Sequence, residues 1–156
     1  MNYTLRRAER GDALNIRRLI WRLRLNPASL DWRRFWVAVD ENGGLIGCGQ
    51  LKPHRGGIVE MASIAVEPAF QRQGVGRAII ERLLAQHQRE HPAQPLYLTC
   101  RPRMEGYYQR YQFTALADEQ MPLYYRRIRR LACCLKRIFP AMDLPTVMRR
   151  EGDNAI

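Results

Sequence analysis

The sequence predicts one α/β domain in which helices cover both faces of a mixed, mostly antiparallel sheet of six to seven strands. Its 156 residues are enough for a single hydrophobic core. Hydrophobic residues make up 46% of the chain and charged residues 26%, which are the proportions of a globular protein. Strand-like segments form a hairpin early in the chain and flank a helical segment later, so strands and helices do not alternate strictly.

The first half of the chain predicts four strands and three helical segments. Apolar residues alternate in the strands and recur at intervals of three and four residues in the helices. Asp12 can cap the first helix, Asn26-Pro27 ends it, and a turn at 40–44 joins two strands into a hairpin. The expected strands are 3–8, 35–39, 45–52 and 58–66, and the expected helices are 12–25, 30–35 and 74–88.

The second half of the chain predicts two strands around a short helix, then a long helix and a last strand. The first three elements are expected at 96–100, 104–110 and 112–116, with the helix in the middle. Pro122 stands where a helix would begin, and an amphipathic helix of about five turns follows. Its apolar stripe consists of Tyr124, Ile128, Leu131, Leu135 and Ile138. We expect a single domain over 1–156, with a core at 1–116, this extra basic helix at 122–139 and a closing strand at 145–150.

The net charge of +11 comes almost entirely from arginine and favours an anionic partner. Nucleic acid, an anionic membrane face and a phosphorylated cofactor all qualify, and charge alone does not choose among them. Residues 1–7 lack the apolar segment of a signal peptide, and no apolar run reaches membrane-spanning length. We therefore expect a cytoplasmic protein.

Metal-binding patterns are weak in this sequence. The four cysteines are Cys48, Cys100, Cys133 and Cys134. They show no CxxC spacing, so we expect reduced and mostly buried thiols. His87 and His91 stand four residues apart on an expected helix, but His91 precedes Pro92 and no third ligand is near. We expect no metal site.

The segment from Ile64 to Arg77 carries the strongest chemical signal. A buried strand ends in a short polar loop, and Gly74 and Gly76 open a helix. Free N–H groups at a helix start bind anions, and glycine removes the Cβ atoms that would hold a phosphate away from them. Because Arg72 and Arg77 add positive charge, the segment predicts a pyrophosphate cradle.

Two better-known phosphate motifs do not fit these residues. A P-loop needs Lys and then Ser or Thr after its last glycine, where this chain has Arg77-Ala78. A dinucleotide fingerprint needs a third glycine, where this chain has Ile79. A glycine-rich helix start with no ligand remains open as an alternative.

Two segments resemble a known family. The run from Gln71 to Gly76, after Val66-Glu67-Pro68, resembles the Q/R-x-x-G-x-G/A signature of the GNAT superfamily of acyl-CoA-dependent N-acyltransferases. The run Tyr107–Phe113 is similar to the second element of that family. The resemblance extends from Tyr3 to about Leu116, with the last strand near Val147. It implies a splayed three-layer fold that binds acetyl-CoA.

The resemblance also implies roles for individual residues. The backbone N–H groups of Arg72 through Arg77 would bind the coenzyme A pyrophosphate, and the backbone of Ile64, Ala65 and Val66 would pair with the pantetheine arm. The expected cofactor-binding residues are Ile64, Ala65, Val66, Gln71, Arg72, Gln73, Gly74, Val75, Gly76, Arg77 and Arg101.

Two residues are candidates for acid–base catalysis. Glu60 stands where several family members carry a general base, and an apolar strand would raise its pKa. Tyr108 matches the tyrosine that protonates the leaving thiolate in the family, a reaction that suits a phenol with an ordinary pKa. The alternatives are a solvent-facing acid for Glu60 and a packing aromatic for Tyr108.

The chain departs from the family pattern at three places. Arg101 replaces a frequent asparagine seven residues before Tyr108, and Gln112 replaces the usual glycine before Phe113. The third is the basic helix at 122–139, whose cations are Arg126, Arg127, Arg129, Arg130, Lys136 and Arg137. We expect its apolar stripe to pack on its own domain or on a second copy in a homodimer, and we do not expect nucleic acid or a membrane as its partner.

The predicted function is transfer of an acetyl group from acetyl-CoA to a primary amine of a small molecule or peptide by direct attack. An acyl-CoA-binding sensor or interaction module without turnover is the second hypothesis, and nucleic-acid binding through the arginine surface is the third. By analogy with the family, residues 25–32 and the helix after Pro122 border the acceptor pocket. The residue types there do not name the amine.

Overall fold

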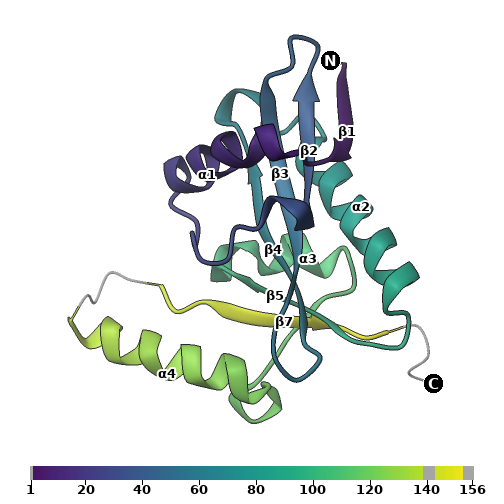
Figure 1. Cartoon of the computed structure of the whole chain (residues 1–156). Coiled ribbons are helices and arrows are strands. Elements are labelled where there is room, and N and C mark those ends of the chain that lie inside the picture. Colours follow the sequence, from purple (N-terminus) through teal and green to yellow (C-terminus); the bar gives the residue numbers. More distant parts are fainter. Residues whose placement is uncertain (1, 139–142, 153–156) are drawn as a thin grey trace. The chain divides into compact units, whose positions relative to one another are not determined.

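Residues 2–138 and 143–152 are described by the computed structural model, in which the chain divides into two units (Figure 1). Unit 1 spans Met1–Pro92 and unit 2 spans Ala93–Ile156. Each unit has its own antiparallel strand pairings, and the described residues of the two units form seven strands. That number is the upper end of the predicted range. The single domain over 1–156 and its subdivision stay a prediction.

Unit 1 contains a four-stranded antiparallel meander. Its strands are β1 (Tyr3–Arg7), β2 (Phe35–Asp40), β3 (Leu45–Pro53) and β4 (Val59–Val66). Each strand pairs with the next one along the chain. Their bounds agree with the predicted ones to within two residues, which is the usual uncertainty of strand ends.

Helix α1 (Ala13–Arg22) ends three residues earlier than the prediction of 12–25. Arg24 adopts a left-handed conformation with φ of 53°, and its N–H donates to the carbonyl of Trp21. The N–H of Leu25 donates to the carbonyl of Ile20. These bonds end the helix in the way that a glycine in the left-handed conformation usually does. Because arginine stands in that position, the sequence did not indicate that the helix ends here. The segment expected at 30–35 is a short 3-10 turn, η2 (Trp32–Arg34).

The two long helices of unit 1 cover opposite faces of its sheet. On one face Phe35, Val37 and Val39 pack with Ile16 and Leu19 of α1. Helix α2 (Val75–Glu90) packs on the other face. It lies so close that a Cβ on Gly49 of β3 would stand 2.7 Å from Ile79 Cγ2. Because no side chain fits there, Gly49 allows this approach.

Strand β4 is irregular near its middle. The register between β3 and β4 shifts between Cys48 and Gln50, and Ser63 has a φ of 57°. A bulge of this kind bends a strand and turns side chains in new directions. Gln50 Nε2 donates to Ser63 Oγ at 3.0 Å, which fixes the bulge from the neighbouring strand.

Unit 2 is built around its last strand. Strand β7 (Thr146–Arg150) pairs antiparallel with β5 (Leu96–Cys100) and with β6 (Thr114–Ala115). The helix expected at 104–110 is a 3-10 turn, η4 (Pro102–Met104), that continues into α3 (Glu105–Gln109). The strand expected at 112–116 is shorter because Gln112 adopts φ of 66°, outside the extended region.

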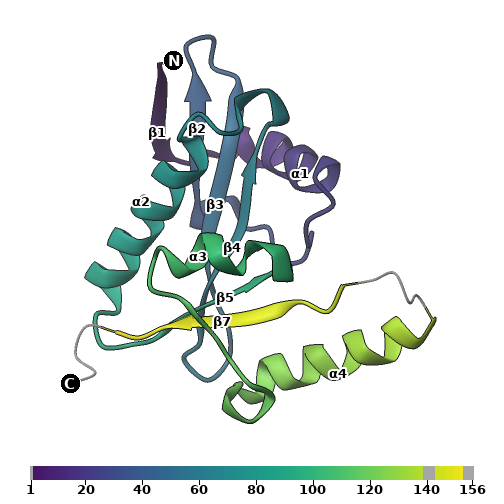
Figure 2. The same cartoon turned by 180° about the vertical axis from the view of Figure 1, so that it is seen from behind.

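Helix α4 (Leu123–Ile138) forms where Pro122 predicted its start, and β7 follows it (Figure 2). Residue 139, the last of the predicted helix, lies outside the described residues. Tyr125 is buried and its ring lies 5.6 Å from that of Tyr97 on β5. Of the predicted stripe, Tyr124 is half-buried and its ring lies 5.0 Å from that of Tyr125, but the other four side chains do not pack on the domain as expected. Ile128, Leu131, Leu135 and Ile138 are all exposed.

The prediction of mostly buried thiols is wrong for half of the cysteines. Cys48 is buried and Cys100 is half-buried, but Cys133 and Cys134 on α4 are exposed. Within residues 2–138 and 143–152, no group of three or more potential ligands is placed to hold a metal ion. No helix in the same ranges has both the length and the apolarity needed to cross a membrane.

Candidate active site

The predicted phosphate cradle lies where β4 gives way to α2 in unit 1. The 3-10 turn η3 (Pro68–Phe70) leads into the loop Gln71–Gly74, and Gly74 has a φ of 85°. The first N–H groups of a helix have no partner within it. A Cβ on Gly74 would meet no atom within 4 Å, and one on Gly76 would meet only Val66 Cγ2, at 3.5 Å. The helix start is therefore open on one side, as an anion site requires.

Side chains of the loop hold it in shape. Gln71 Nε2 donates to the carbonyl of Val66 at 3.0 Å, and Gln73 Nε2 donates to that of Ala69 at 2.9 Å. Both side-chain amides donate to backbone carbonyls, which leaves the N–H groups of the loop and the helix start as the candidate donors to an anion. Arg72 is exposed and has a φ of 61°, a strained conformation for a residue with a side chain.

The residues expected to pair with pantetheine end strand β4. Ala65 pairs with Cys48 of β3, Val66 pairs with Gly47, and the N–H of Glu67 donates to the carbonyl of Ile46 at 2.8 Å. The carboxylate of Glu67 forms an ion pair with Arg22. These contacts hold the strand end and α1 together, which gives the cradle a fixed base.

Glu60 lies near the start of the same strand and is 9% exposed. Its Oε2 lies 2.6 Å from Nε2 of His54, and Lys52 stands opposite it in the register of β3 and β4. The sequence predicted an apolar environment, but the side chains around this carboxylate are polar. Both Glu60 and the glycine helix start lie in unit 1. Glu60 is near the start of β4, and the helix start comes after the loop that follows the end of β4.

A row of polar side chains follows the same face of the sheet. Lys52 is 8% exposed and its Nζ donates to the carbonyl of Ala28 at 3.3 Å. Gln50 is fully buried, and its Nε2 contacts the carbonyl of Ser29 at 3.4 Å. Sequence reasoning missed both residues. The sequence does contain a sign of them. Gln50 and Lys52 are polar residues two positions apart in a predicted strand, so their side chains lie on the same face.

Unit 2 holds Tyr108 and Arg101. Tyr108 lies on α3, and its ring centroid is 6.3 Å from that of Phe113. Burial raises the pKa of Tyr108 to about 12, helped by the nearby Cys100 and Tyr111. The expectation of an ordinary phenol pKa for Tyr108 is therefore wrong. Arg101 is exposed and precedes the turn η4, where its carbonyl accepts from the N–H of Met104.

Gln112 occupies a position that suits glycine. Its φ of 66° lies in the left-handed region, where a Cβ costs about 1 kcal/mol. The side chain accepts a hydrogen bond from Arg150 at 3.3 Å. The family pattern has glycine here, and the backbone keeps the glycine-like conformation in spite of the substitution.

Comparison with known proteins identifies the family. A family model described as an acetyltransferase (GNAT) domain matches residues 31–115, which is more than half of the chain. The chain belongs to the GNAT acetyltransferase family. The match includes Glu60, the cradle and Tyr108, and leaves α4 and β7 outside.

Two known proteins are similar to this chain. An amino-acid acetyltransferase of Mycobacterium tuberculosis is 41% identical over 54 residues, which are 33% of this chain and 31% of that protein. The N-acetylglutamate synthase of Neisseria gonorrhoeae, solved with coenzyme A and N-acetyl-glutamate, has a TM-score of 0.77 at 19% identity. That match covers 97% of this chain and 35% of the other. This GNAT chain thus spans about a third of the length of these two relatives.

A third comparison covers both chains nearly completely. A Mycobacterium tuberculosis protein solved with CoA has a TM-score of 0.70 at 24% identity over 95% of this chain and 98% of the other. These structures show that the predicted GNAT fold, an α/β fold with a mixed sheet, is correct.

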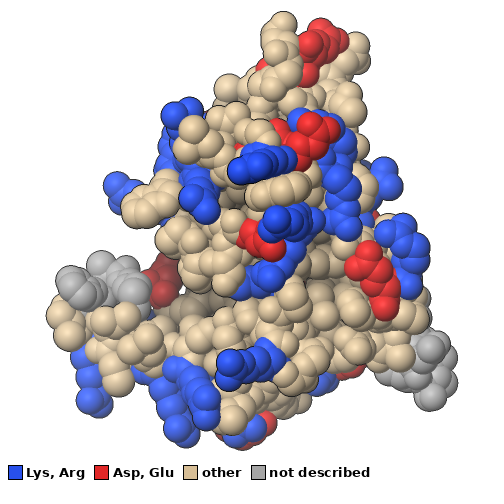
Figure 3. All heavy atoms as spheres, viewed as in Figure 1, with Lys and Arg blue, Asp and Glu red and all other residues tan. Residues whose placement is uncertain are grey.

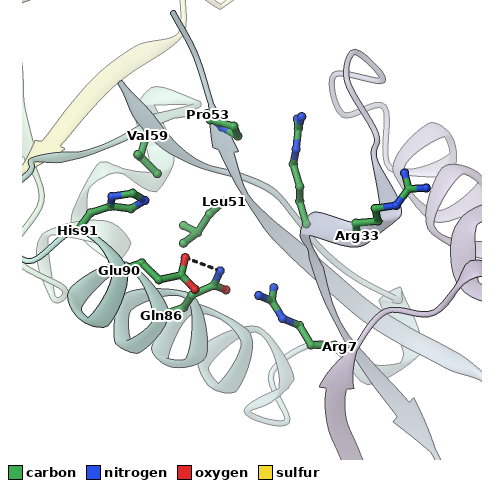
Figure 4. A pocket seen from close by; sticks show the side chains of 9 residues that line it. Arg7, Arg33, Leu51, Pro53, Val59, Gln86, Glu90 and His91 are labelled. Atoms are coloured by element: carbon green, nitrogen blue, oxygen red, sulfur yellow. Dashed lines mark hydrogen bonds between the residues drawn. The ribbon is translucent and has the colours of Figure 1, made fainter. Parts of the chain in front are cut away.

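The GNAT chain also has an arginine-lined pocket away from Glu60 (Figure 4). Leu51 and Val59 line it, and they alternate with Lys52 and Glu60, so it opens on the face covered by α2. Figure 4 shows the guanidinium of Arg7 pointing toward the side chains of α2. None of the residues predicted for the active site lines this pocket.

Proposed function

We propose that this GNAT chain transfers an acetyl group from acetyl-CoA to the primary amine of an amino acid or a similar small acceptor. The observation that carries the proposal is the arrangement on β4. The strand begins near the buried carboxylate of Glu60 and ends at Val66, from which η3 and the loop Gln71–Gly74 lead to the open glycine helix start. About six residues separate Glu60 from Val66, a span of about 20 Å along a strand.

In this proposal, the cradle holds the cofactor through backbone N–H groups at Arg72 to Arg77. The pyrophosphate of acetyl-CoA carries negative charge, which the helix dipole and the exposed Arg72 attract. The backbone of Ile64 to Val66 pairs with the pantetheine arm as an added strand would. Arg101 contributes a further cation toward a phosphate.

Glu60 acts as the general base. The neutral acceptor amine attacks the thioester carbonyl, and as the carbon–nitrogen bond forms its nitrogen gives up one proton to the carboxylate, directly or through a water. His54, at 2.6 Å, holds the orientation of the carboxylate. The tetrahedral intermediate then collapses as the carbon–sulfur bond breaks, and no covalent enzyme intermediate forms.

Tyr108 acts as the general acid toward the leaving thiolate. Because its pKa is raised to about 12, the phenol keeps its proton throughout the neutral range. The transfer makes the coenzyme A thiol and a tyrosinate that takes a proton back from solvent. Because its pKa is raised, this phenol is a weaker acid than a free tyrosine. It therefore gives up its proton only once negative charge has developed on the sulfur.

The polar row on β3 supports an acceptor that carries a carboxylate. Lys52 is a buried cation opposite Glu60, and Gln50 lies next to it on the same face. A carboxylate at Lys52 would leave the amine of a small amino acid near Glu60. The similarity to an amino-acid acetyltransferase favours the same class of acceptor.

Acetyl transfer is tested by following thiol release from acetyl-CoA with a panel of amino acids, polyamines, aminoglycosides and lysine peptides. We expect release above the amine-free control, with the highest kcat/KM for an amino acid and a weaker response for its carboxamide. Higher activity with polyamines would overturn the acceptor class. Binding of acetyl-CoA by calorimetry without release for any amine would favour an acyl-CoA sensor instead.

A further inference from the structure

Helix α4 exposes an unusually long row of large apolar side chains. From here on, the apolar stripe is this exposed row, in which Leu123 replaces the half-buried Tyr124 of the predicted stripe: Leu123, Ile128, Leu131, Leu135 and Ile138. Leu131 and Ile138 are 63% and 70% exposed. At about 100° per residue, the five side chains lie within roughly 140° of the helix circumference. Large apolar side chains exposed together on one side of a helix are typical of an interaction surface.

The helix is anchored to unit 2 by a different side. Tyr125 is buried against Tyr97 of β5, and it lies about 120° around the helix from Leu131. Arg129 forms an ion pair with Asp118 at 2.9 Å, and Arg126 Nε donates to the carbonyl of Met121 at 2.8 Å. The anchor therefore fixes the orientation of the helix without covering the stripe.

Cationic side chains cover most of the helix surface outside the stripe, and one cation, Arg127, lies within the arc of the stripe, about 40° around the helix from Leu123. Its basic residues are Arg126, Arg127, Arg129, Arg130, Lys136 and Arg137, and the segment Leu123–Ile138 contains no acidic residue. In Figure 3, Lys and Arg side chains gather where α4 lies in Figure 1, along the edge of an uncharged surface. Among the described residues, no carboxylate lies within 4.0 Å of the charged groups of Arg127, Arg130 or Arg137.

The sequence led us to expect no membrane partner, but the exposure of the stripe argues against that expectation. We propose that α4 binds the surface of an anionic lipid membrane, with the apolar stripe among the acyl chains and the arginines at the headgroups. An interfacial helix needs an apolar face, a cationic polar face and low overall hydrophobicity, and α4 has all three. Its 16 residues make a rod of about 24 Å that would lie in the plane of the membrane.

Charge argues for a lipid surface over the other two possible partners. Two stripes packed against each other in a homodimer would bring two sets of six cations together without an acid on either helix, which is electrostatically unfavourable. A nucleic acid would satisfy the arginines but would leave the leucines and isoleucines in water. An anionic bilayer satisfies both faces at once.

The first experiment is flotation of the full chain with lipid vesicles. We expect binding to vesicles of phosphatidylcholine with about 30% phosphatidylglycerol, and little binding to phosphatidylcholine alone. Raising the salt from about 0.1 M to about 0.5 M should weaken the binding, because screening reduces the attraction of the arginines to the headgroups. Equal binding to neutral and anionic vesicles would overturn the role of charge.

Paired variants separate the two faces of the helix. The double variant Leu131→Gln/Leu135→Gln removes apolar area and keeps the charge, and Arg127→Gln/Arg130→Gln/Arg137→Gln does the opposite. We expect each to weaken vesicle binding by roughly a hundredfold. The controls are Trp21→Gln, which removes an exposed hydrophobic on α1, and Arg10→Gln/Arg17→Gln/Arg18→Gln, which removes three exposed cations of unit 1. Both controls should bind as the unchanged chain does.

A dye on an exposed cysteine of α4 tests whether this helix enters the apolar part of the membrane. In Cys133→Ser, Cys134 is the one exposed cysteine among the described residues and can carry an environment-sensitive dye. Anionic vesicles should shift the dye emission to shorter wavelength, and circular dichroism checks that the variants remain folded.

Two results would overturn the proposal in favour of another partner. In the first, the leucine variant turns a dimer into a monomer and leaves vesicle binding unchanged. In the second, the chain binds single-stranded RNA with an affinity that the leucine variant keeps and the arginine variant loses.

Discussion

Nε2 of His54 lies 2.6 Å from Oε2 of Glu60, and both side chains are almost completely enclosed in unit 1. His54 follows β3 and Glu60 lies near the start of β4, so the two groups face each other across the turn that joins these strands. The contact fixes the carboxylate in one orientation. A carboxylate held in place beside a polar row is suited to accept a proton from a bound amine.

The change Glu60→Gln tests the assignment of the base. We expect kcat/KM for the best amine to fall by roughly a hundredfold, because the amide cannot accept the proton. The affinity for acetyl-CoA, measured by calorimetry, should stay the same. Glu41→Gln is the matched control, since Glu41 is an exposed acid in the turn after β2. Full activity of Glu60→Gln over the whole pH range would exclude Glu60 as the base.

The change Gly74→Ala tests the cradle. A φ of 85° is unfavourable for alanine, so we expect a loss of about 1 kcal/mol in the free energy of unfolding. We also expect weaker binding of acetyl-CoA, because the new Cβ projects into the open space at the helix start.

Gly43→Ala is a close control for this variant. Gly43 has a φ of 79° and equally open space, but it lies in the hairpin turn between β2 and β3. Both variants should lose similar stability in urea denaturation, and only Gly74→Ala should lose affinity for acetyl-CoA. An equal loss of affinity in both would mean that the cradle is not the binding site.

Much of the fold could be predicted because periodicity determines which face of an element is buried. The apolar residues of α2 recur at helical spacing, and the expected helix 74–88 differs from Val75–Glu90 by one residue at its start and two at its end. The end of α1 could not be predicted, because Arg24 adopts a left-handed conformation that its residue type does not favour. Local propensity gave no sign of it.

Part of the local geometry at the candidate site could be predicted, for a different reason. A glycine at a helix start favours a left-handed conformation, and Gly74 adopts it, while the role of this loop as a cradle stays a prediction. The surroundings of Glu60 depend on which residues stand opposite it, and strand register is not visible in one sequence. His54 and Lys52 were therefore missed as neighbours. Amphipathic spacing in α4 likewise shows that an apolar face exists, but not whether the domain covers it.

The change Tyr108→Phe tests the general acid. We expect kcat to fall roughly a hundredfold with little change in KM for the amine, because the lost proton is needed only as the thiolate leaves. Since the pKa of Tyr108 is about 12, its ionisation should cause no fall in kcat between pH 7 and 10 in the unchanged enzyme. Tyr3→Phe on β1 is the control. If kcat is unchanged in Tyr108→Phe, Tyr108 is a packing residue and not the general acid.

The ion pair between Arg6 and Asp12 should make stability depend on acid pH. Arg6 Nη1 lies 2.7 Å from Asp12 Oδ2, and the N–H of Glu9 donates to the same oxygen at 2.7 Å. Burial by itself would raise the pKa of Asp12, but the bonds from Arg6 and Glu9 and the charge of Arg6 outweigh it and lower the pKa below the ordinary value of an aspartate. The stabilisation is thus complete above the unfolded pKa and is lost as the pH falls through the lower folded pKa.

Asp12→Asn measures this contribution. We expect the variant to be less stable than the unchanged chain by about 1 to 2 kcal/mol in urea denaturation at pH 6. The difference should shrink as the pH is lowered toward 3, because the unchanged chain then loses the same interaction by protonation. Glu41→Gln serves again as the control and should show no such pH-dependent gap. A gap for Asp12→Asn that stays constant down to pH 3 would mean that Asp12 acts through packing or neutral hydrogen bonds and not through its charge.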